Sequence, residues 1–183
     1  MKKVAEFKKV EFMNFCLEVS GLYCELYEAR KCDSLEYCLK TEIDVLQEYY
    51  DNIKLPKRAT SGSAGHDIAV PYQVTMNPGD VLKIPTGLRC MMDKGYVMMI
   101  YPRSGLGVKN HMFISNTTPV IDSDYYYAEN EGHIFIQLEN RGDKILHLKG
   151  GDTFAQAVFV PFGVADVEEV DGVRTGGFGS TGR

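Results

Sequence analysis

A mainly β protein with a helical segment near its N-terminus is the fold class that the sequence predicts, and three observations support it. Residues 1–55 contain one glycine and no proline, whereas the other glycines of the 18 and all 7 prolines follow. After Pro56, turn sequences such as NPGD and NRGD recur about every eight to twelve residues, as in a β-sandwich or barrel. Before Pro56, apolar residues recur at helical steps of three and four.

The N-terminal part divides into a strand and a helical insert. Residues 1–10 are expected to supply the first strand of the core, over 4–10. Residues 11–54 carry ten acidic and four basic side chains on two helical stripes, so we expect an acidic αα-hairpin that packs on its neighbour. The first stripe is Phe12, Phe15, Val19, Leu22, Tyr23 and Leu26, and the second is Leu35, Leu39, Ile43, Leu46 and Tyr50.

The remaining chain is expected to form one β-domain over 55–173 and a Gly-rich arm over 174–183. Short apolar or alternating runs lie between the turn sequences and predict strands. The clearest of these runs are 81–84, 96–101, 134–138 and 154–160.

Composition excludes several classes of protein. With 183 residues, 44% hydrophobic and 25% charged, the chain has the composition of a globular domain. The longest apolar run, 96–101, is too short to cross a bilayer, and no secretory signal is recognisable. A net charge of −5 argues against stable nucleic-acid binding. Five cysteines without a tight pairing motif favour a reducing, cytoplasmic compartment, in a bacterium, a phage or elsewhere.

Four stretches carry groups suited to chemistry, although each alone has a simpler explanation. SAGHD presents Asp67 in a small-residue turn, where most aspartates only form the turn. PRSGLG offers Arg103, a hydroxyl and backbone N–H groups to phosphate, but a tight turn needs glycines anyway. NTTPVIDSDY alone is a polar loop. RTGGFGSTG sets Phe178 among glycines, although a terminus commonly frays.

Taken together, these stretches occur in a specific order. With Gln156 added, the order is AGHD, PRSGLG, NTTPVIDSDY, GDTFAQ and RTGGFGSTG. It resembles the five motifs of the trimeric dUTPases, the deoxyuridine triphosphate nucleotidohydrolases, over about residues 56–183. The last motif, GGFGSTG, is nearly diagnostic of that family.

The resemblance implies a fold, a reaction and an assembly. The fold would be a jelly-roll-like β-domain, with the arm closing over the active site. The reaction would be hydrolysis of dUTP to dUMP and pyrophosphate with magnesium, which keeps uracil out of DNA and supplies dUMP. Water would attack the α-phosphorus, and a homotrimer would hold three shared active sites.

The resemblance also assigns roles to residues. Asp122 would hold and polarise the attacking water, Asp67 would orient water around magnesium, and Tyr125 would pack against the deoxyribose. The residues expected to hold the phosphates are Arg103, Ser104, Gly105 and Gln156, and those expected at the outer phosphates are Arg174, Ser180 and Thr181. Uracil would be bound by Asn116 and by the backbone of a hairpin that runs through Val120 and Ile121. Phe178 would act as a lid over the uracil, and Gly179 beside it is also expected to contact the substrate.

The chain departs from the family pattern at three places near the site. His66 stands where the family usually has an aromatic residue, and Pro119 where it usually has glycine. Residues 126–131 intervene where the family usually turns at once through glycine after the tyrosine. Asp124 is expected to be a loop or trimer-contact residue, and none of the four histidines is expected to act in catalysis.

Two alternatives follow from the same residues. A dCTP deaminase would share the fold, but that family lacks the GGFGSTG tail. The acidic insert could instead dock a protein partner, in addition to catalysis or in place of it, or it could be a packing elaboration. Its cysteines lack the C-x₂₋₄-C spacing of structural zinc sites.

Overall fold

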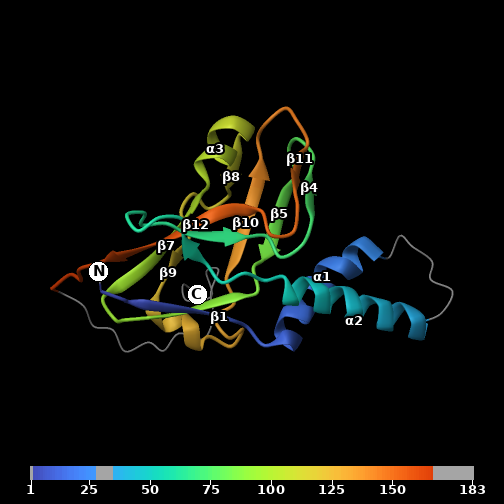
Figure 1. Ribbon diagram of the computed structural model, residues 1–183, viewed down its shortest axis with the longest axis horizontal. Helices are drawn as coiled ribbons and strands as arrows, with labels where there is room; N and C mark the ends of the chain where they lie inside the picture. Colours follow the sequence, from blue (N-terminus) through green and yellow to red (C-terminus); the bar gives the residue numbers. More distant parts are fainter. Residues whose placement is uncertain (1, 28–34, 167–183) are drawn as a thin grey trace.

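The computed structural model describes residues 2–27 and 35–166, with side chains for 2–19 and 43–166. Its elements are β1 (Ala5–Lys9), α1 (Phe12–Tyr27), α2 (Leu35–Asp51), β2 (Lys57–Arg58), β3 (His66–Ala69), β4 (Val74–Met76), β5 (Val81–Pro85), β6 (Leu88–Met92), β7 (Tyr96–Pro102), α3 (Ser104–Asn110), β8 (Met112–Ile114), β9 (Val120–Ile121), the 3₁₀-helix η1 (Ser123–Tyr127), β10 (Phe135–Asn140), β11 (Leu146–Leu148) and β12 (Thr153–Pro161). The predicted mainly β class is confirmed (Figure 1).

The strands of the described chain pair antiparallel throughout, in four small sheets. The largest has the order β2-β3-β12-β7-β9, and a three-stranded sheet has the order β5-β10-β8. The other two sheets pair β1 with β6 and β11 with β4. The long strands β12 and β7 run side by side from Ala155, opposite Pro102, to Pro161, opposite Tyr96, so they form the frame that places the surrounding loops.

Alternation along the strands separates a core face from an outer face. Met98 and Ile100 of β7 are fully buried with Ala157 of β12, whereas Met99 and Val158, the neighbouring register pair, are only partly buried. Ile136 and Leu138 of β10 are also fully buried and join the same cluster. The period of two predicted from the sequence therefore identifies which side chains face the core.

The two helices project together from one side of the β-domain (Figure 1). Their base is held by Lys9 Nζ, which donates to the Tyr50 carbonyl at 2.7 Å, and by the Tyr50 hydroxyl, which donates to the Val10 carbonyl at 2.7 Å. Phe15 and Leu46 are buried, as their stripes predict. Ile43 is 55% exposed, so its expected place on the buried stripe is wrong.

No helix among the described residues combines the length and the apolar character needed to cross a membrane. Five members of the two apolar stripes lie outside the described side chains, namely Leu22, Tyr23, Leu26, Leu35 and Leu39.

Candidate functional site

Three of the expected site residues meet where β3, β12 and β7 run together. Gln156 on β12 lies opposite Asp67 on β3 and Tyr101 on β7. Arg103, which directly follows β7, donates from Nη1 to Asp67 Oδ1 at 2.6 Å. Gln156 Nε2 donates to the Pro102 carbonyl at 3.3 Å. The sheet register therefore brings an arginine, a carboxylate and an amide to one place, which we call the phosphate end.

Close packing at the phosphate end depends on a glycine. A Cβ atom at Gly65 would collide with the Gln156 side-chain amide. Since only glycine lacks that atom, the small residue in the predicted AGHD turn lets the turn pass directly over Gln156. The Arg103 side chain stays 39% exposed and that of Asp67 18%, so both charged groups remain within reach of a ligand.

The segment that follows Arg103 differs from the predicted turn. It forms a seven-residue helix, α3, and Arg103 is its N-cap. The Arg103 carbonyl accepts the N–H groups of both Leu106 and Gly107, at 3.0 Å each. Ser104 and Gly105 consequently occupy the first turn of a helix, where backbone N–H groups have no acceptor within the helix.

The expected uracil hairpin is also different in the structure. β8 pairs with β10, whereas β9 pairs with β7, so the predicted hairpin is wrong and the segment is a corner between two sheets. Asn116 lies in that corner, beside Thr117, whose φ of 62° lies in the left-handed region. The Thr117 N–H bonds the Ile114 carbonyl at 2.9 Å, which turns the chain out of β8.

A cavity opens beside Asn116. Its volume is about 270 Å³, and it is lined by Ser115, Asn116, Phe135 and Gln137. Val120 and Ile121 form β9 on the other side of the corner, and the side chain of Val120 is 55% exposed. The corner thus presents amide, hydroxyl and aromatic groups around a space large enough for a small ring.

Asp122 and Tyr125 follow β9 in η1. Asp122 is the N-cap of this 3₁₀-helix and is half-buried. Tyr125 is 5% exposed. Its hydroxyl donates to the His133 carbonyl at 2.7 Å and accepts from Asn130 Nδ2 at 2.9 Å. We call this region, from Asn116 to Tyr125, the base and sugar end.

The register separates the two ends within one chain. Ile121 lies opposite Met98, so Asp122, one residue further, is level with Val97. Arg103 is six residues along β7 from Val97, or about 20 Å at roughly 3.3 Å per residue. Asp67 lies on β3, three strands across the sheet from β9, which adds about 14 Å sideways. The structure therefore does not bring Asp122 to Asp67 and Arg103 of the same chain.

Sequence reasoning missed Asn130 and assigned no specific place to His133. His133 is 1% exposed, and its Nε2 accepts the Gly87 N–H at 2.9 Å. Burial, and secondarily the charge of Lys83, lowers the pKa of His133 to about 4. The buried ring thus serves as a hydrogen-bond acceptor for the backbone of Gly87. Asn130 lies in the extra segment 126–131, whose length was the only available signal.

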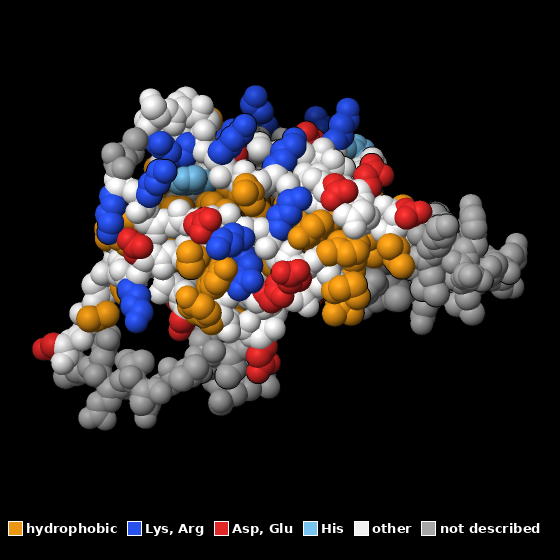
Figure 2. Space-filling model, turned by 60° about the horizontal axis from the view of Figure 1, so that its bottom comes forward, with side chains coloured by type: hydrophobic (Ala, Val, Ile, Leu, Met, Phe, Trp, Pro, Cys, Tyr) orange, Lys and Arg blue, Asp and Glu red, His pale blue; other side chains and the backbone are white. Residues whose placement is uncertain are grey.

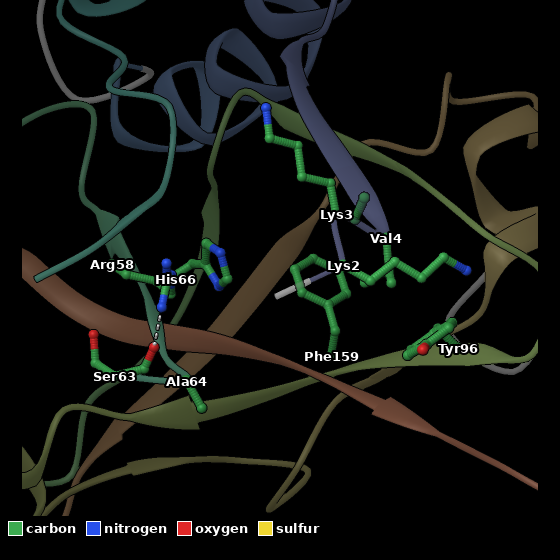
Figure 3. A pocket seen from close by; sticks show the side chains of 10 residues that line it. Lys2, Lys3, Val4, Arg58, Ser63, Ala64, His66, Tyr96 and Phe159 are labelled. Carbon is green, nitrogen blue, oxygen red and sulfur yellow. Dashed lines mark hydrogen bonds between the residues drawn. The ribbon is translucent and has the colours of Figure 1, made fainter. Parts of the chain in front are cut away.

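Another cavity belongs to neither end. About 600 Å³ in volume, it lies between the segment before β1 and the strands β3, β7 and β12 (Figure 3). His66 and Phe159 line it, and Arg58 Nη1 donates to the Ser63 carbonyl at 3.1 Å across its rim. Because neighbouring strand residues point to opposite faces, His66 points into this cavity while Asp67 points away from it.

The expected arm residues lie outside the described residues. These are Arg174, Phe178, Gly179, Ser180 and Thr181.

Comparisons with known proteins agree with the five motifs. A family model described as dUTPase matches residues 51–183. The deoxyuridine 5'-triphosphate nucleotidohydrolase of Lactococcus lactis is 43% identical over 143 residues, which are 76% of this chain and 95% of the relative. That of Alcanivorax borkumensis is 39% identical over 141 residues, with 73% and 91% covered.

Solved structures give the same result for the fold. The dUTPase of Streptococcus mutans aligns with a TM-score of 0.58 and 38% identity over 63% of this chain and 91% of that one. The dUTPase of phage phi11 of S. aureus aligns with a TM-score of 0.56 over 67% and 92%, and at 24% identity this likeness concerns the fold alone. Residues 1–50, which contain β1 and most of both N-terminal helices, lie outside the family match.

Proposed function

Since this chain belongs to the dUTPase family and is a dUTP diphosphatase, we propose that it works as a homotrimer whose active sites are shared between copies. The separation of Asp122 from Arg103 along β7 carries this proposal, because one chain holds the two ends too far apart for one triphosphate. The outer face of the large sheet supports it, since Met99, Val158 and Val160 are apolar there and only partly buried.

The phosphate end would bind the triphosphate. Arg103 supplies a guanidinium that can pair with two phosphate oxygens at once. Ser104 and Gly105 add a hydroxyl and backbone N–H groups from the first turn of α3, and Gln156 adds its amide. The ion pair with Asp67 holds Arg103 in place before the substrate arrives, so less ordering is needed on binding.

Asp122 would act on the water that attacks the α-phosphorus. Its carboxylate accepts a proton from that water as the oxygen–phosphorus bond forms. The bond between the α-phosphorus and the bridging oxygen breaks, and pyrophosphate leaves with that oxygen. The products are dUMP and pyrophosphate, and the proton taken by Asp122 passes to solvent.

Magnesium would reside mainly on the substrate. Hard oxygen donors suit this ion, which commonly keeps several waters and binds substrate phosphates. Asp67 offers such a donor at the phosphate end, where it would hold a magnesium-bound water. No group of three acidic, histidine or cysteine side chains in the described part of the chain is placed to hold a metal alone. When bound, the ion would supply positive charge to offset that on the leaving pyrophosphate.

The base and sugar end would select deoxyuridine. Asn116 and the backbone through Val120 and Ile121 would bind the uracil edge in the corner between β8 and β9. Tyr125 would close the space beside the sugar and exclude a 2′-hydroxyl. The arm would bring Phe178 over the uracil, with Arg174, Gly179, Ser180 and Thr181 around the phosphates, so that water is excluded once the substrate is bound.

Mixing two inactive variants tests the shared site. Arg103→Ala and Asp122→Asn chains, co-expressed in equal amounts, should recover about a quarter of the wild-type activity. Each shared site takes its Arg103 from one copy and its Asp122 from another, so in randomly mixed trimers about one site in four has both residues intact. Either variant alone serves as the control and should stay inactive. Failure to recover activity in a confirmed mixed trimer would contradict the proposal, as would an active monomer in light scattering.

Substrate selection is tested separately. Pyrophosphate release with magnesium should be much faster for dUTP than for dTTP, dCTP or UTP. Equal turnover of dTTP and dUTP would contradict the proposed uracil site.

A second proposal concerns the helices, which would dock a protein partner in addition to catalysis. In Figure 2 hydrophobic side chains gather on the surface next to the grey region at the right of the view. Met13 and Leu17 of α1 and Ile43 of α2 are 66%, 67% and 55% exposed. A solved dUTPase of Staphylococcus bacteriophage 80alpha is described as controlling transfer of virulence genes, and at 22% identity it shares the fold. A variant without 12–51 that keeps full dUTP turnover would support a separate role for the helices.

We also propose that the enzyme works in a reducing, cytoplasmic compartment. Cys16 and Cys90 carry free thiols, which such a compartment preserves.

A further inference from the structure

The extra loop after Tyr125 turns back to contact Tyr125 itself. Asn130 Nδ2 lies 2.9 Å from the Tyr125 hydroxyl oxygen and 3.5 Å from the His133 carbonyl oxygen. The Tyr125 hydroxyl donates to that carbonyl at 2.7 Å. The Tyr125 hydroxyl thus has a donor partner in Asn130 and an acceptor partner in His133. A tyrosine held at its hydroxyl cannot tilt without breaking both hydrogen bonds.

The backbone of the loop is built to return over Tyr125. Gly132 has a φ of 68°, and a Cβ there would lie 2.6 Å from the Tyr125 carbonyl oxygen and 2.7 Å from Tyr126 Cα. Asn130 Oδ1 accepts the Gly132 N–H at 3.2 Å. The Asn130 side chain therefore links the returning backbone, through Oδ1, to the tyrosine, through Nδ2.

Both ends of the loop are fastened to other elements. Arg89 of β6 donates from Nη2 to the Tyr126 carbonyl at 2.8 Å and stacks 3.9 Å from the centre of the Tyr126 ring. Glu131 lies 3.8 Å from Arg89 Nη1, and its Oε2 accepts the Glu11 N–H, at the start of α1, at 2.9 Å. Since the loop is fixed at both ends, Asn130 presents its amide to Tyr125 in a defined position.

We propose that Asn130 is a positioning residue for Tyr125 and thereby strengthens the preference of the enzyme for deoxyribose over ribose. A ring fixed at its hydroxyl leaves a constant space beside C2′, whereas a ring that can tilt admits the extra oxygen of UTP. This inference rests on the proposed role of Tyr125 beside the sugar. It assigns a use to the segment 126–131, which the rest of the proposed mechanism does not employ.

The test measures the ratio of kcat/KM for dUTP to that for UTP. Asn130→Ala removes the amide, and Asn130→Asp removes the donor while keeping the oxygen that accepts the Gly132 N–H. Both should lower the ratio about 2- to 10-fold, the value of one hydrogen bond, chiefly through faster UTP turnover. Asn77→Ala is the matched control, because it removes a surface amide that bonds Asp80 at 3.1 Å in the turn between β4 and β5, outside both ends, and its ratio should be unchanged.

A double-mutant cycle separates positioning from loop stability. Tyr125→Phe removes the hydroxyl, so adding Asn130→Ala to it should lower the ratio no further. An additive effect, or an unchanged ratio in both Asn130 variants, would overturn the positioning role. Tyr125→Ala separates a failure of this inference from a failure of the proposed sugar contact. If Tyr125→Ala lowers the dUTP/UTP ratio but the Asn130 variants do not, only the positioning role of Asn130 is refuted. If Tyr125→Ala also leaves the ratio unchanged, the proposed contact between Tyr125 and the sugar is refuted as well.

Discussion

The two ends of the site are held by different kinds of structure. At the phosphate end, regular pairing of β3, β12 and β7 aligns Asp67, Gln156 and Arg103, and an ion pair at the surface completes the arrangement. At the base and sugar end, Tyr125 is buried in the 3₁₀-helix η1 and held by hydrogen bonds to residues that follow it. The comparison indicates that strand register aligns Asp67, Gln156 and Arg103, whereas loop contacts position Tyr125.

The largest expected effect is the loss of the charge at Asp122. Asp122→Asn keeps the size of the side chain but cannot accept the proton of the attacking water, so turnover should fall about 10²- to 10⁴-fold. Nucleotide binding should persist, because the phosphate end is untouched, and calorimetry with a non-hydrolysable dUTP analogue measures it. Asp124→Asn, two residues away and exposed, is the matched control. Comparable losses in both variants would refute the assignment.

The arm should contribute the next largest effect at the base and sugar end. Stacking of an aromatic ring on a base is worth about 1–3 kcal/mol, so Phe178→Ala should lower kcat/KM for dUTP about 5- to 150-fold. Phe178→Trp should retain much of the activity, and its fluorescence should change when dUTP binds. Truncation before Arg174 should leave the protein trimeric and cut turnover at least as severely as Phe178→Ala. Full turnover in the truncated chain would exclude a role for the arm.

A smaller effect at the phosphate end concerns the magnesium dependence of the reaction. Asp67→Asn removes the carboxylate that would hold a magnesium-bound water. Loss of such an outer-shell ligand should raise the magnesium concentration for half-maximal activity by about tenfold. EDTA should abolish activity in the wild-type enzyme without lowering its melting temperature. An unchanged magnesium dependence in Asp67→Asn would place the cation elsewhere.

The last effect concerns the free energy of unfolding rather than turnover, and it appears only in acid. His133 has a pKa of about 4 in the folded chain, below the ordinary 6.5. Between these values the unfolded chain binds the proton more readily, so the free energy of unfolding should decrease as the pH falls from about 6.5 to about 4, by up to about 1.4 kcal/mol per pH unit. His133→Gln, which keeps an acceptor for the Gly87 N–H, should flatten this slope. His147→Gln, at an exposed site, should leave the slope as in the wild type, and denaturant titrations across this pH range measure it.

Much of the fold followed from local pattern. The runs predicted at 81–84 and 154–160 correspond to β5 and β12. These strands could be predicted because alternating polarity and flanking turn residues are visible within a short stretch of sequence. The helix after Arg103 was missed, since glycines at 105 and 107 favour a turn on propensity alone. In the folded chain, the Arg103 carbonyl accepts two N–H groups and starts α3.

The order of the motifs and the chemistry of their side chains were enough to determine the family and the reaction. The residues of such a site lie in short segments, and the residue types in each segment are constrained by the group that they bind. The tertiary structure alone decided how those segments lie relative to one another. Whether β9 pairs with β8 or with β7 depends on contacts between residues distant in sequence, and that choice puts Asp122 level with Val97, far from Arg103. The contact of Asn130 with Tyr125 arises in the same way, because a loop's path depends on its anchors, here Arg89 and the start of α1, which lie tens of residues away along the chain.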